Sequence, residues 1–143
     1  MNLKEMVDRH QTAMNSIYRR VNIILKEKIH SDITTDQFST LNYIRKHDRC
    51  TSSDIAHEFG IGKSAVTAQI NRLFDKELIE RKRDDKDRRV VYLIVTEKGI
   101  EFVNFTEKAL HEELEKYLKD FSQDEISMFI NLLERLSNNM EDK

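Results

Sequence analysis

Nine consecutive charged side chains, at residues 81–89, run directly into an apolar stretch that contains Val90, Val91, Leu93 and Val95. Six of the nine are basic and three are acidic. Lysine and arginine side chains can form charge-assisted hydrogen bonds with phosphate groups. The alternative is a solvated loop in front of a strand, which is what most charged runs are. The neighbouring segments decide between these two interpretations.

A second set of polar side chains lies earlier in the chain, in the segment KSAVTAQINRLF. The apolar residues Val66, Ile70 and Leu73 recur there at helical spacing and mark one buried face. The opposite face carries small or polar side chains: Lys63, Ser64, Thr67, Ala68, Asn71 and Arg72. In a major groove, asparagine can pair with adenine, and arginine with guanine or phosphate. An ordinary solvent-facing helix surface is the alternative.

Three capping-box patterns predict where helices begin: Thr34 with Gln37, Thr51 with Asp54, and Ser122 with Glu125. Gly60-Ile61-Gly62 predicts a tight turn between the second of these helices and the helix that starts at Lys63. The apolar runs 78–79 and 90–95 predict the two strands of a hairpin around the charged run. Residues 96–99 are expected to form a turn, followed by a helix over 100–121.

Helix, tight turn, helix and hairpin is the element order of a winged helix-turn-helix. The predicted fold is therefore mainly α with a small β-hairpin, the wing. The helix that begins at Lys63 would read the major groove of double-stranded DNA. The wing tip would present Arg83, Lys86, Arg88 and Arg89 to a flanking minor groove, where a narrow groove attracts arginine. The interleaved aspartates would repel phosphate unless they pair with these arginines.

The two ends of the chain predict helices with broad apolar stripes. The first stripe runs from Leu3 to Ile29, and the predicted helix ends at Ser31-Asp32. Core packing inside one chain would cover such a surface, but dimerisation covers it better. The net charge is +3 over residues 60–98 and −6 over residues 99–143, which indicates a polyanion-facing surface and a separate acidic one. We expect one domain over 1–143, with the DNA-binding region at 34–99 and dimerisation helices at 1–33 and 100–143.

Composition excludes several classes of protein. The chain has 143 residues, no proline and one cysteine, Cys50, which rules out an internal disulfide framework and suits a reducing cytoplasm. Neither a signal peptide nor an apolar run long enough for a membrane span is present, so we expect a cytoplasmic location without membrane attachment. A glycine-rich phosphate loop and a paired Cys/His nucleophile are also absent from the sequence. We therefore expect no enzymatic activity and no cofactor.

The chain resembles transcriptional regulators of the MarR family over nearly its whole length. The resemblance rests on Ser53-Asp54-Ile55-Ala56, on Ser64-Ala65-Val66-Thr67 and on Leu78-Ile79-Glu80-Arg81. Its most specific part is Asp84-Asp85-Lys86-Asp87-Arg88-Arg89, which leads into Leu93 and Thr96-Glu97-Lys98-Gly99.

The resemblance implies a homodimeric regulator that acts as a repressor and binds a pseudo-palindromic operator. It implies that Arg89 enters the minor groove while Asp87 braces it, and that the first and last helices form the dimer interface. Family members often carry glycine where this chain has Glu77, a residue that disfavours a left-handed helix cap. A winged helix used only for protein contacts is the alternative function.

The family divides by the signal that it senses. A small aromatic or phenolic effector is the common ligand class, and Tyr18, Phe38 and Tyr43 are candidates for its pocket, although all three fit a core equally well. The same family also includes metal-responsive and redox-responsive regulators. The candidate metal ligands are Glu27, His30, Glu107 and His111, none of which has a cysteine beside it. For Cys50, the position favours a small buried hydrophobic residue.

Overall fold

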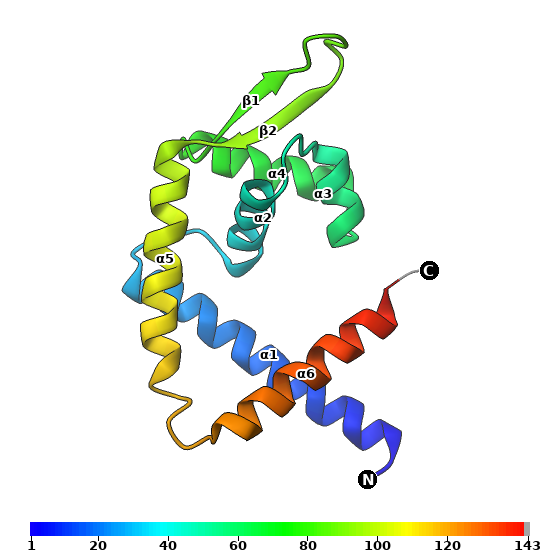
Figure 1. Cartoon of the computed structure of the whole chain (residues 1–143), viewed down its shortest axis with the longest axis vertical. Helices are drawn as coiled ribbons and strands as arrows, with labels where there is room; N and C mark the ends of the chain where they lie inside the picture. Colours follow the sequence, from blue (N-terminus) through cyan, green and yellow to red (C-terminus); the bar gives the residue numbers. More distant parts are fainter. Residues whose placement is uncertain (142–143) are drawn as a thin grey trace. The chain divides into compact units, whose positions relative to one another are not determined.

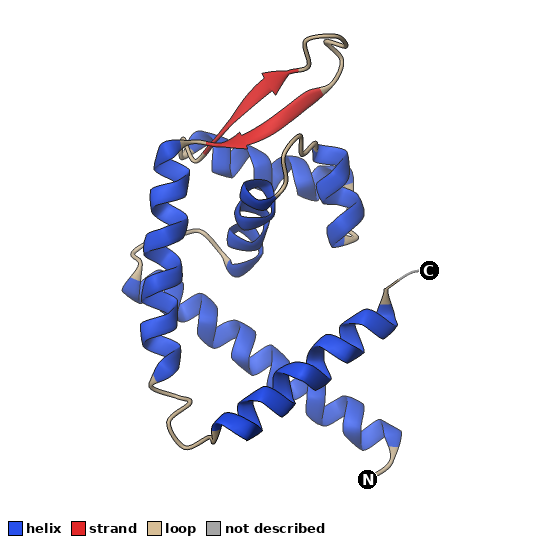
Figure 2. Ribbon diagram, viewed as in Figure 1, coloured by secondary structure: helices blue, strands red, loops and turns tan. Residues whose placement is uncertain are grey.

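The computed structural model describes residues 1–141 and consists of six helices and one two-stranded hairpin within that range (Figures 1 and 2). In chain order the elements are α1 (Leu3–Lys28), α2 (Thr35–Lys46), α3 (Ser52–Phe59), α4 (Lys63–Asp75), β1 (Ile79–Arg83), β2 (Val91–Val95), α5 (Glu97–Glu115) and α6 (Gln123–Met140). The chain forms two compact units, Met1–Leu110 and the part that begins at His111. The predicted mainly helical fold with a β-hairpin is confirmed.

All three predicted capping boxes are present. At the start of α2, the Thr34 side chain accepts a hydrogen bond from the Gln37 amide, and the Gln37 side chain accepts one from the Thr34 amide. The same reciprocal pair opens α3 at Thr51 and α6 at Ser122. The predicted turn after α3 is also confirmed, because Gly60 adopts the left-handed conformation with φ of 60°. Short local patterns thus determined where these helices begin.

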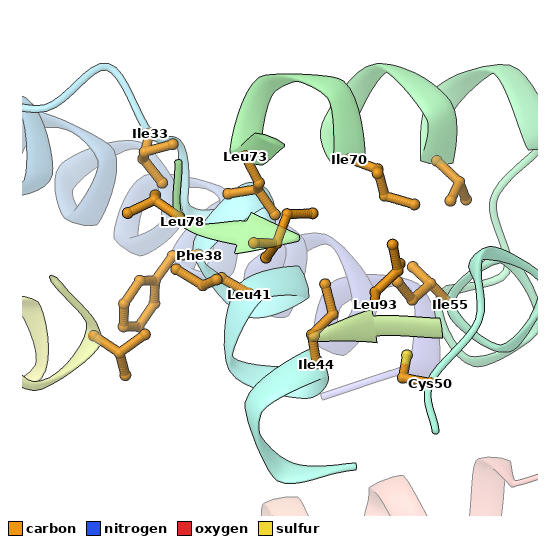
Figure 3. Packing of buried hydrophobic residues seen from close by; sticks show 13 residues of the cluster. Ile33, Phe38, Leu41, Ile44, Cys50, Ile55, Ile70, Leu73, Leu78 and Leu93 are labelled. Atoms are coloured by element: carbon orange, nitrogen blue, oxygen red, sulfur yellow. The ribbon is translucent and has the colours of Figure 1, made fainter. Parts of the chain in front are cut away.

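The core of the first unit is built from α2, α3, α4, the hairpin and the first turns of α5. Figure 3 shows how side chains from these segments meet in one cluster. Leu41, Ile55 and Leu73 are completely buried at its centre. Val66 and Ile70 of α4 join them, as the helical spacing predicted. This core fixes α4 against its scaffold and leaves the opposite face of the helix exposed.

The hairpin is antiparallel, and its register runs from Ile79 opposite Val95 to Arg83 opposite Val91. The predicted hairpin is confirmed, but the predicted bounds of its first strand, residues 78–79, were wrong, because β1 starts at Ile79 and continues through Lys82 to Arg83. These charged residues join the strand because the apolar β2 supplies the partner and the charged heads stay in solvent. The segment that connects the strands, residues 84–90, is called the wing tip below.

Three predicted helix boundaries were also wrong. Residues 96–99 do not form a separate turn, since α5 begins at Glu97, and the Thr96 hydroxyl accepts a hydrogen bond from the Gly99 amide at 3.0 Å. Gly99 is required by packing, because a Cβ atom there would overlap the Leu78 carbonyl oxygen and lie 2.6 Å from Val95 Cγ1. The helix α5 ends at Glu115, before the predicted end at residue 121. The helix α1 ends at Lys28, before the predicted end at Ser31-Asp32.

The terminal helices α1 and α6 each expose apolar side chains. Leu25 is the buried residue of α1, and α6 buries none. On α6 the exposed apolar side chains are Met128, Phe129, Ile130, Leu132, Leu136 and Met140. Among residues 1–141, no helix is long and apolar enough to cross a membrane.

Candidate nucleic-acid interface

The outer face of α4 is the first part of the candidate interface. All six predicted residues of this face, here called the reading face, are exposed: Lys63, Ser64, Thr67, Ala68, Asn71 and Arg72. Their counterparts Val66, Ile70 and Leu73 are at most 3% exposed. An α-helix fits the major groove of B-DNA, and short side chains on its outer face permit close approach to base edges.

The start of α4 lacks the side-chain cap found on α2, α3 and α6. Gly62 is the N-cap and makes no side-chain hydrogen bond, and the first turn has no acidic residue. The first amide groups of a helix have no intrahelical partner and carry the positive end of the helix dipole. This end of α4 can therefore donate hydrogen bonds to an anion such as a phosphate group.

The end of α4 shows a left-handed helix cap in spite of its sequence. Glu77 has φ of 62°, the Glu77 amide donates to Phe74 O at 2.9 Å, and the Leu78 amide donates to Leu73 O at 3.0 Å. These two bonds are the Schellman pattern that glycine usually allows. The expectation that glutamate would disfavour the cap was wrong. Tertiary contacts impose it, because the Thr96 hydroxyl donates to Glu77 O at 2.7 Å.

The wing tip is organised by Asp84. Its Oδ2 atom accepts hydrogen bonds from the amides of Lys86 at 3.1 Å and Asp87 at 2.9 Å. These backbone bonds, that of Asp87 above all, lower the pKa of the Asp84 carboxyl below its ordinary value. The turn also closes through the Asp84 amide, which donates to Val90 O at 2.9 Å. The carboxylate is thus engaged by backbone amides and shapes the tip around it.

Asp87 and Arg89 form a two-pronged ion pair at the wing tip. Arg89 Nε donates to Asp87 Oδ1 at 3.0 Å, and Arg89 Nη2 donates to Asp87 Oδ2 at 3.2 Å. The hydrogen bonds from the Arg89 side chain lower the pKa of the Asp87 carboxyl. The Arg89 side chain is 90% exposed although it is held in this geometry. An exposed, oriented guanidinium of this kind suits insertion between phosphate groups.

The base of the wing is fixed to the rest of the unit near Cys50. The Leu93 amide donates to Cys50 O at 2.7 Å, and the guanidinium of Arg49 lies over the Tyr92 ring at 5.4 Å from its centroid. Cys50 itself is 2% exposed, and burial raises the pKa of its thiol to about 11. A buried, protonated thiol is a poor nucleophile, so the geometry disfavours a redox role.

Arg72 on the reading face has an intramolecular partner that sequence reasoning missed. Its Nη2 atom binds Asp32 Oδ2, and Lys76 Nζ lies 2.5 Å from Asp32 Oδ1. The hydrogen bond from Lys76 lowers the pKa of the Asp32 carboxyl. Asp32 precedes α2 and is far from Arg72 in the sequence, so no local pattern could have linked them. The aspartate offsets positive charge near the C-terminal end of α4.

Arg81 was also missed as a member of this region. Its Nη2 atom donates to Asn71 Oδ1 at 3.2 Å, and its guanidinium carbon lies 4.5 Å from the centroid of the Phe74 ring. By contrast, Arg83 donates to Arg88 O at 2.8 Å and so stabilises the wing tip. Period-two alternation along β1 is the signal that could have assigned Arg81 to the side of the hairpin facing α4.

The candidate effector residues lie in three different settings. Tyr18 donates to Asp36 Oδ2 at 2.9 Å, and this bond raises the pKa of its hydroxyl. Phe38 is part of the core cluster, and the Tyr43 ring stacks on His47 with 3.9 Å between the ring centroids.

One of the candidate metal ligands is engaged by neighbouring side chains. Glu107 Oε1 accepts from Asn42 at 3.4 Å and lies 3.9 Å from Arg45 Nη1. Across residues 1–141, no group of three or more His, Cys, Asp or Glu side chains comes together as metal ligands would.

Comparison with known proteins gives one consistent result. The family model described as "MarR family" matches residues 33–91. The HTH-type transcriptional repressor MdtR of Bacillus subtilis is 28% identical over 131 residues, which cover 89% of this chain and 83% of that protein. The HTH-type transcriptional regulator MhqR of the same organism is 25% identical over 128 residues, or 89% of this chain and 88% of that protein.

Solved structures agree with these sequence matches. The crystal structure of Streptococcus pneumoniae FabT in complex with DNA matches with a TM-score of 0.80 and 26% identity, and the match covers 99% of each chain. The crystal structure of MarR matches with a TM-score of 0.78 and 25% identity over 90% of this chain and 95% of that chain.

Proposed function

Because residues 33–91 match the MarR family model and the relatives are HTH-type transcriptional regulators, we propose that the chain is a MarR-family regulator and binds double-stranded DNA through α4 and the wing. In this proposal the reading face of α4 enters the major groove, and Arg89 enters a flanking minor groove. The observation that carries it is the exposed, two-pronged Asp87–Arg89 pair on the same unit as an exposed reading face. The similar protein FabT has been crystallised in complex with DNA, which supports DNA binding by this chain.

A protein-interaction module explains these features less well. A protein partner would not require a helix start without a side-chain cap or a bank of exposed arginine and lysine at the wing tip. Phosphate recognition uses both, since helix N-termini and basic side chains bind anions. The relatives are transcriptional regulators, which agrees with the expectation that the chain is not an enzyme.

The active form in this proposal is a homodimer. In α6, whose residues are all outside the core, Phe129 and Leu132 are each 54% exposed. On α1, Leu3 is 70% exposed and Ile17 is 52% exposed. Apolar stripes of this size on two helices require a partner surface, and a second copy of the chain provides an identical, self-complementary one.

Repression is the proposed outcome of binding, since the relative MdtR is described as a repressor. A small aromatic or phenolic effector would adjust DNA affinity. A hollow of about 600 Å³ lies where α1 leads into α2, and it is lined by Asn22, Lys26, His30, Ser31, Asp32, Ile33 and Thr34. Its member Asp32 also binds Arg72, so a ligand in this hollow would act directly on the reading face. This hollow is a better candidate for the effector than the core position of Phe38 or the Tyr43–His47 stack, and Tyr18 reaches its edge through Asn22.

The test is to map the duplex fragments that the purified full-length protein binds, together with its mass in solution by light scattering. We expect a dimer and a pseudo-palindromic site whose half-sites lie about one helical turn, roughly 34 Å, apart. Binding should weaken steeply as salt increases. A single-chain mass at micromolar concentration would contradict the dimer, and salt-independent or absent duplex binding would contradict the DNA-binding function.

A further inference from the structure

Arg81 is the residue of the charged run that reaches α4. It follows Ile79 on the same face of β1, because alternate residues of a strand point to the same side. Ile79 is 2% exposed, and the residue opposite Arg81 in the hairpin, Leu93, is 3% exposed. Arg81 therefore starts from the core-facing side of the hairpin, although its head is exposed.

Two contacts fix the position of the Arg81 guanidinium. Its carbon lies 4.5 Å from the centroid of the Phe74 ring, a distance at which a cation is attracted to the ring face. From there Nη2 donates to Asn71 Oδ1 at 3.2 Å. Phe74 and Asn71 are neighbours on the helix surface because they are three residues apart. The ring, the guanidinium and the amide thus form a chain of contacts from the wing to the reading face.

The guanidinium determines which way the Asn71 amide points. A guanidinium has only hydrogen-bond donors, so the amide oxygen must face it and the Nδ2 group must lie on the other side. A free asparagine can exchange these two ends by rotation, and each orientation offers a base edge a different pattern of donor and acceptor. We propose that Arg81 is a positioning residue for sequence reading, which holds the Asn71 amide in one orientation.

The inference rests on the proposed DNA-binding function and makes it more specific. With its orientation fixed, Asn71 presents the Nδ2 donor to an acceptor on a base edge, such as purine N7, while a second lone pair on Oδ1 is available to adenine N6. Holding the amide before binding reduces the side-chain entropy lost when the contact forms. Specificity at one base pair then depends on a residue that does not touch that base.

The test uses the full-length protein and a pool of randomised duplex DNA, followed by single-base-pair variants of the selected site. Asn71→Ala identifies the base pair that Asn71 reads, because the preference there disappears. In the wild-type protein a contact of this type gives roughly 5- to 150-fold discrimination. We expect Arg81→Met to lose most of the preference at that same base pair and to keep the preferences at all others. The double variant Asn71→Ala/Arg81→Met should show the same lack of preference at that base pair as Asn71→Ala alone.

Two further variants separate positioning from charge and from folding. Lys82→Met removes a charge from the neighbouring, oppositely directed position of β1, and it should leave every base preference unchanged. Phe74→Leu removes the ring under the guanidinium but keeps Arg81, and it should weaken the same preference by a smaller factor. Both comparisons use the ratio of the affinities of one variant for two DNA sequences, so a uniform loss of affinity cancels. The thermal midpoint of each variant is measured to show that the protein is folded.

The outcomes distinguish the inference from the function on which it rests. If the wild-type protein selects no sequence, both are overturned. If it selects a site and Arg81→Met keeps the preference that Asn71→Ala loses, only the inference is overturned. Loss of preference at a different base pair would make Arg81 a base reader itself, and an equal loss on all sequences would make it a phosphate contact. Either result also overturns the inference.

Discussion

The reading helix and the wing are held in place by different means. Val66, Ile70 and Leu73 bury one face of α4 in the core, so packing sets the position of its outer face. The wing tip instead takes its shape from hydrogen bonds to Asp84 and Asp87, whose partners lie within a few residues of them in the sequence. Packing gives a rigid surface that can discriminate between bases. Local ion pairs give an oriented charge, and changes in salt or in a single carboxylate disturb it.

Substitution of the wing arginine should have the largest effect. We expect Arg89→Ala to weaken binding to all duplex sequences by about 2 kcal/mol, since hydrogen bonds to charged groups are worth roughly 1.5–3 kcal/mol. The slope of log affinity against log salt should fall by about one, because one phosphate contact is lost. Affinity measured at several salt concentrations checks both. Lys119→Ala, which removes a cation outside the winged-helix region, should change neither.

Removal of the aspartate should also weaken binding, by about 1 kcal/mol, although it makes the wing more basic. Without Asp87, Arg89 loses its two-pronged support and must give up more side-chain entropy on binding. The effects of the two substitutions on binding should be non-additive. The double variant Asp87→Ala/Arg89→Ala should bind DNA only slightly more weakly than Arg89→Ala alone. Asp85→Ala, the adjacent exposed aspartate, is the matched control for charge. Tighter binding by both aspartate variants would show that the carboxylates act only through their charge.

A change at the end of α4 should affect stability and leave binding unaltered. Glu77→Gly removes the strain of a left-handed non-glycine residue, and we expect it to stabilise the fold by about 0.5–1 kcal/mol. That gain corresponds to a rise of roughly 2–4 °C in thermal midpoint. Glu77→Ala removes the same side chain but keeps the strain, so it should bring no gain. A change in salt slope in either variant would contradict the view that Glu77 stabilises the end of α4 without taking part in the DNA contact.

The smallest predicted effect has the opposite sign. Asp32→Asn should release Arg72 and Lys76 and increase affinity for non-specific duplex by about two- to threefold, in line with the small energies of exposed ion pairs. Asp75→Asn, which removes the same charge from the end of α4, is the matched control. The increase should vanish at high salt, where such interactions are screened. Equal gains from both variants would mean that the Asp32 contact itself has no influence.

Local patterns in the sequence predicted much of this fold. The capping boxes placed the starts of α2, α3 and α6, and the spacing of Val66, Ile70 and Leu73 placed the buried face of α4. These features depend on residues three or four positions apart, which is the range over which a helix is specified. Of the candidate interface, the exposed face of α4 was predictable for the same reason. The pairing of Asp87 with Arg89 was instead an implication of the resemblance to the MarR family.

The features that sequence reasoning missed depend on distant contacts. Asp32 meets Arg72 only after the chain has folded, and Arg81 meets Asn71 only through the hairpin register. The strand boundary was misplaced because arginine and lysine have weak strand propensity, which the apolar β2 overrides. At Glu77, contacts with Thr96 outweigh the local preference of the residue. In each case the deciding partner lies outside the window that a local pattern covers.

The close approach at Gly99 has a mechanical consequence. The first turn of α5 lies directly against the Leu78 backbone and the Val95 side chain, with no room for even a methyl group. Leu78 is bonded to the end of α4, and Val95 ends β2. The first turn of α5 therefore has no free space in which to bend against the end of α4 or the end of β2. We expect these three segments to move as one body.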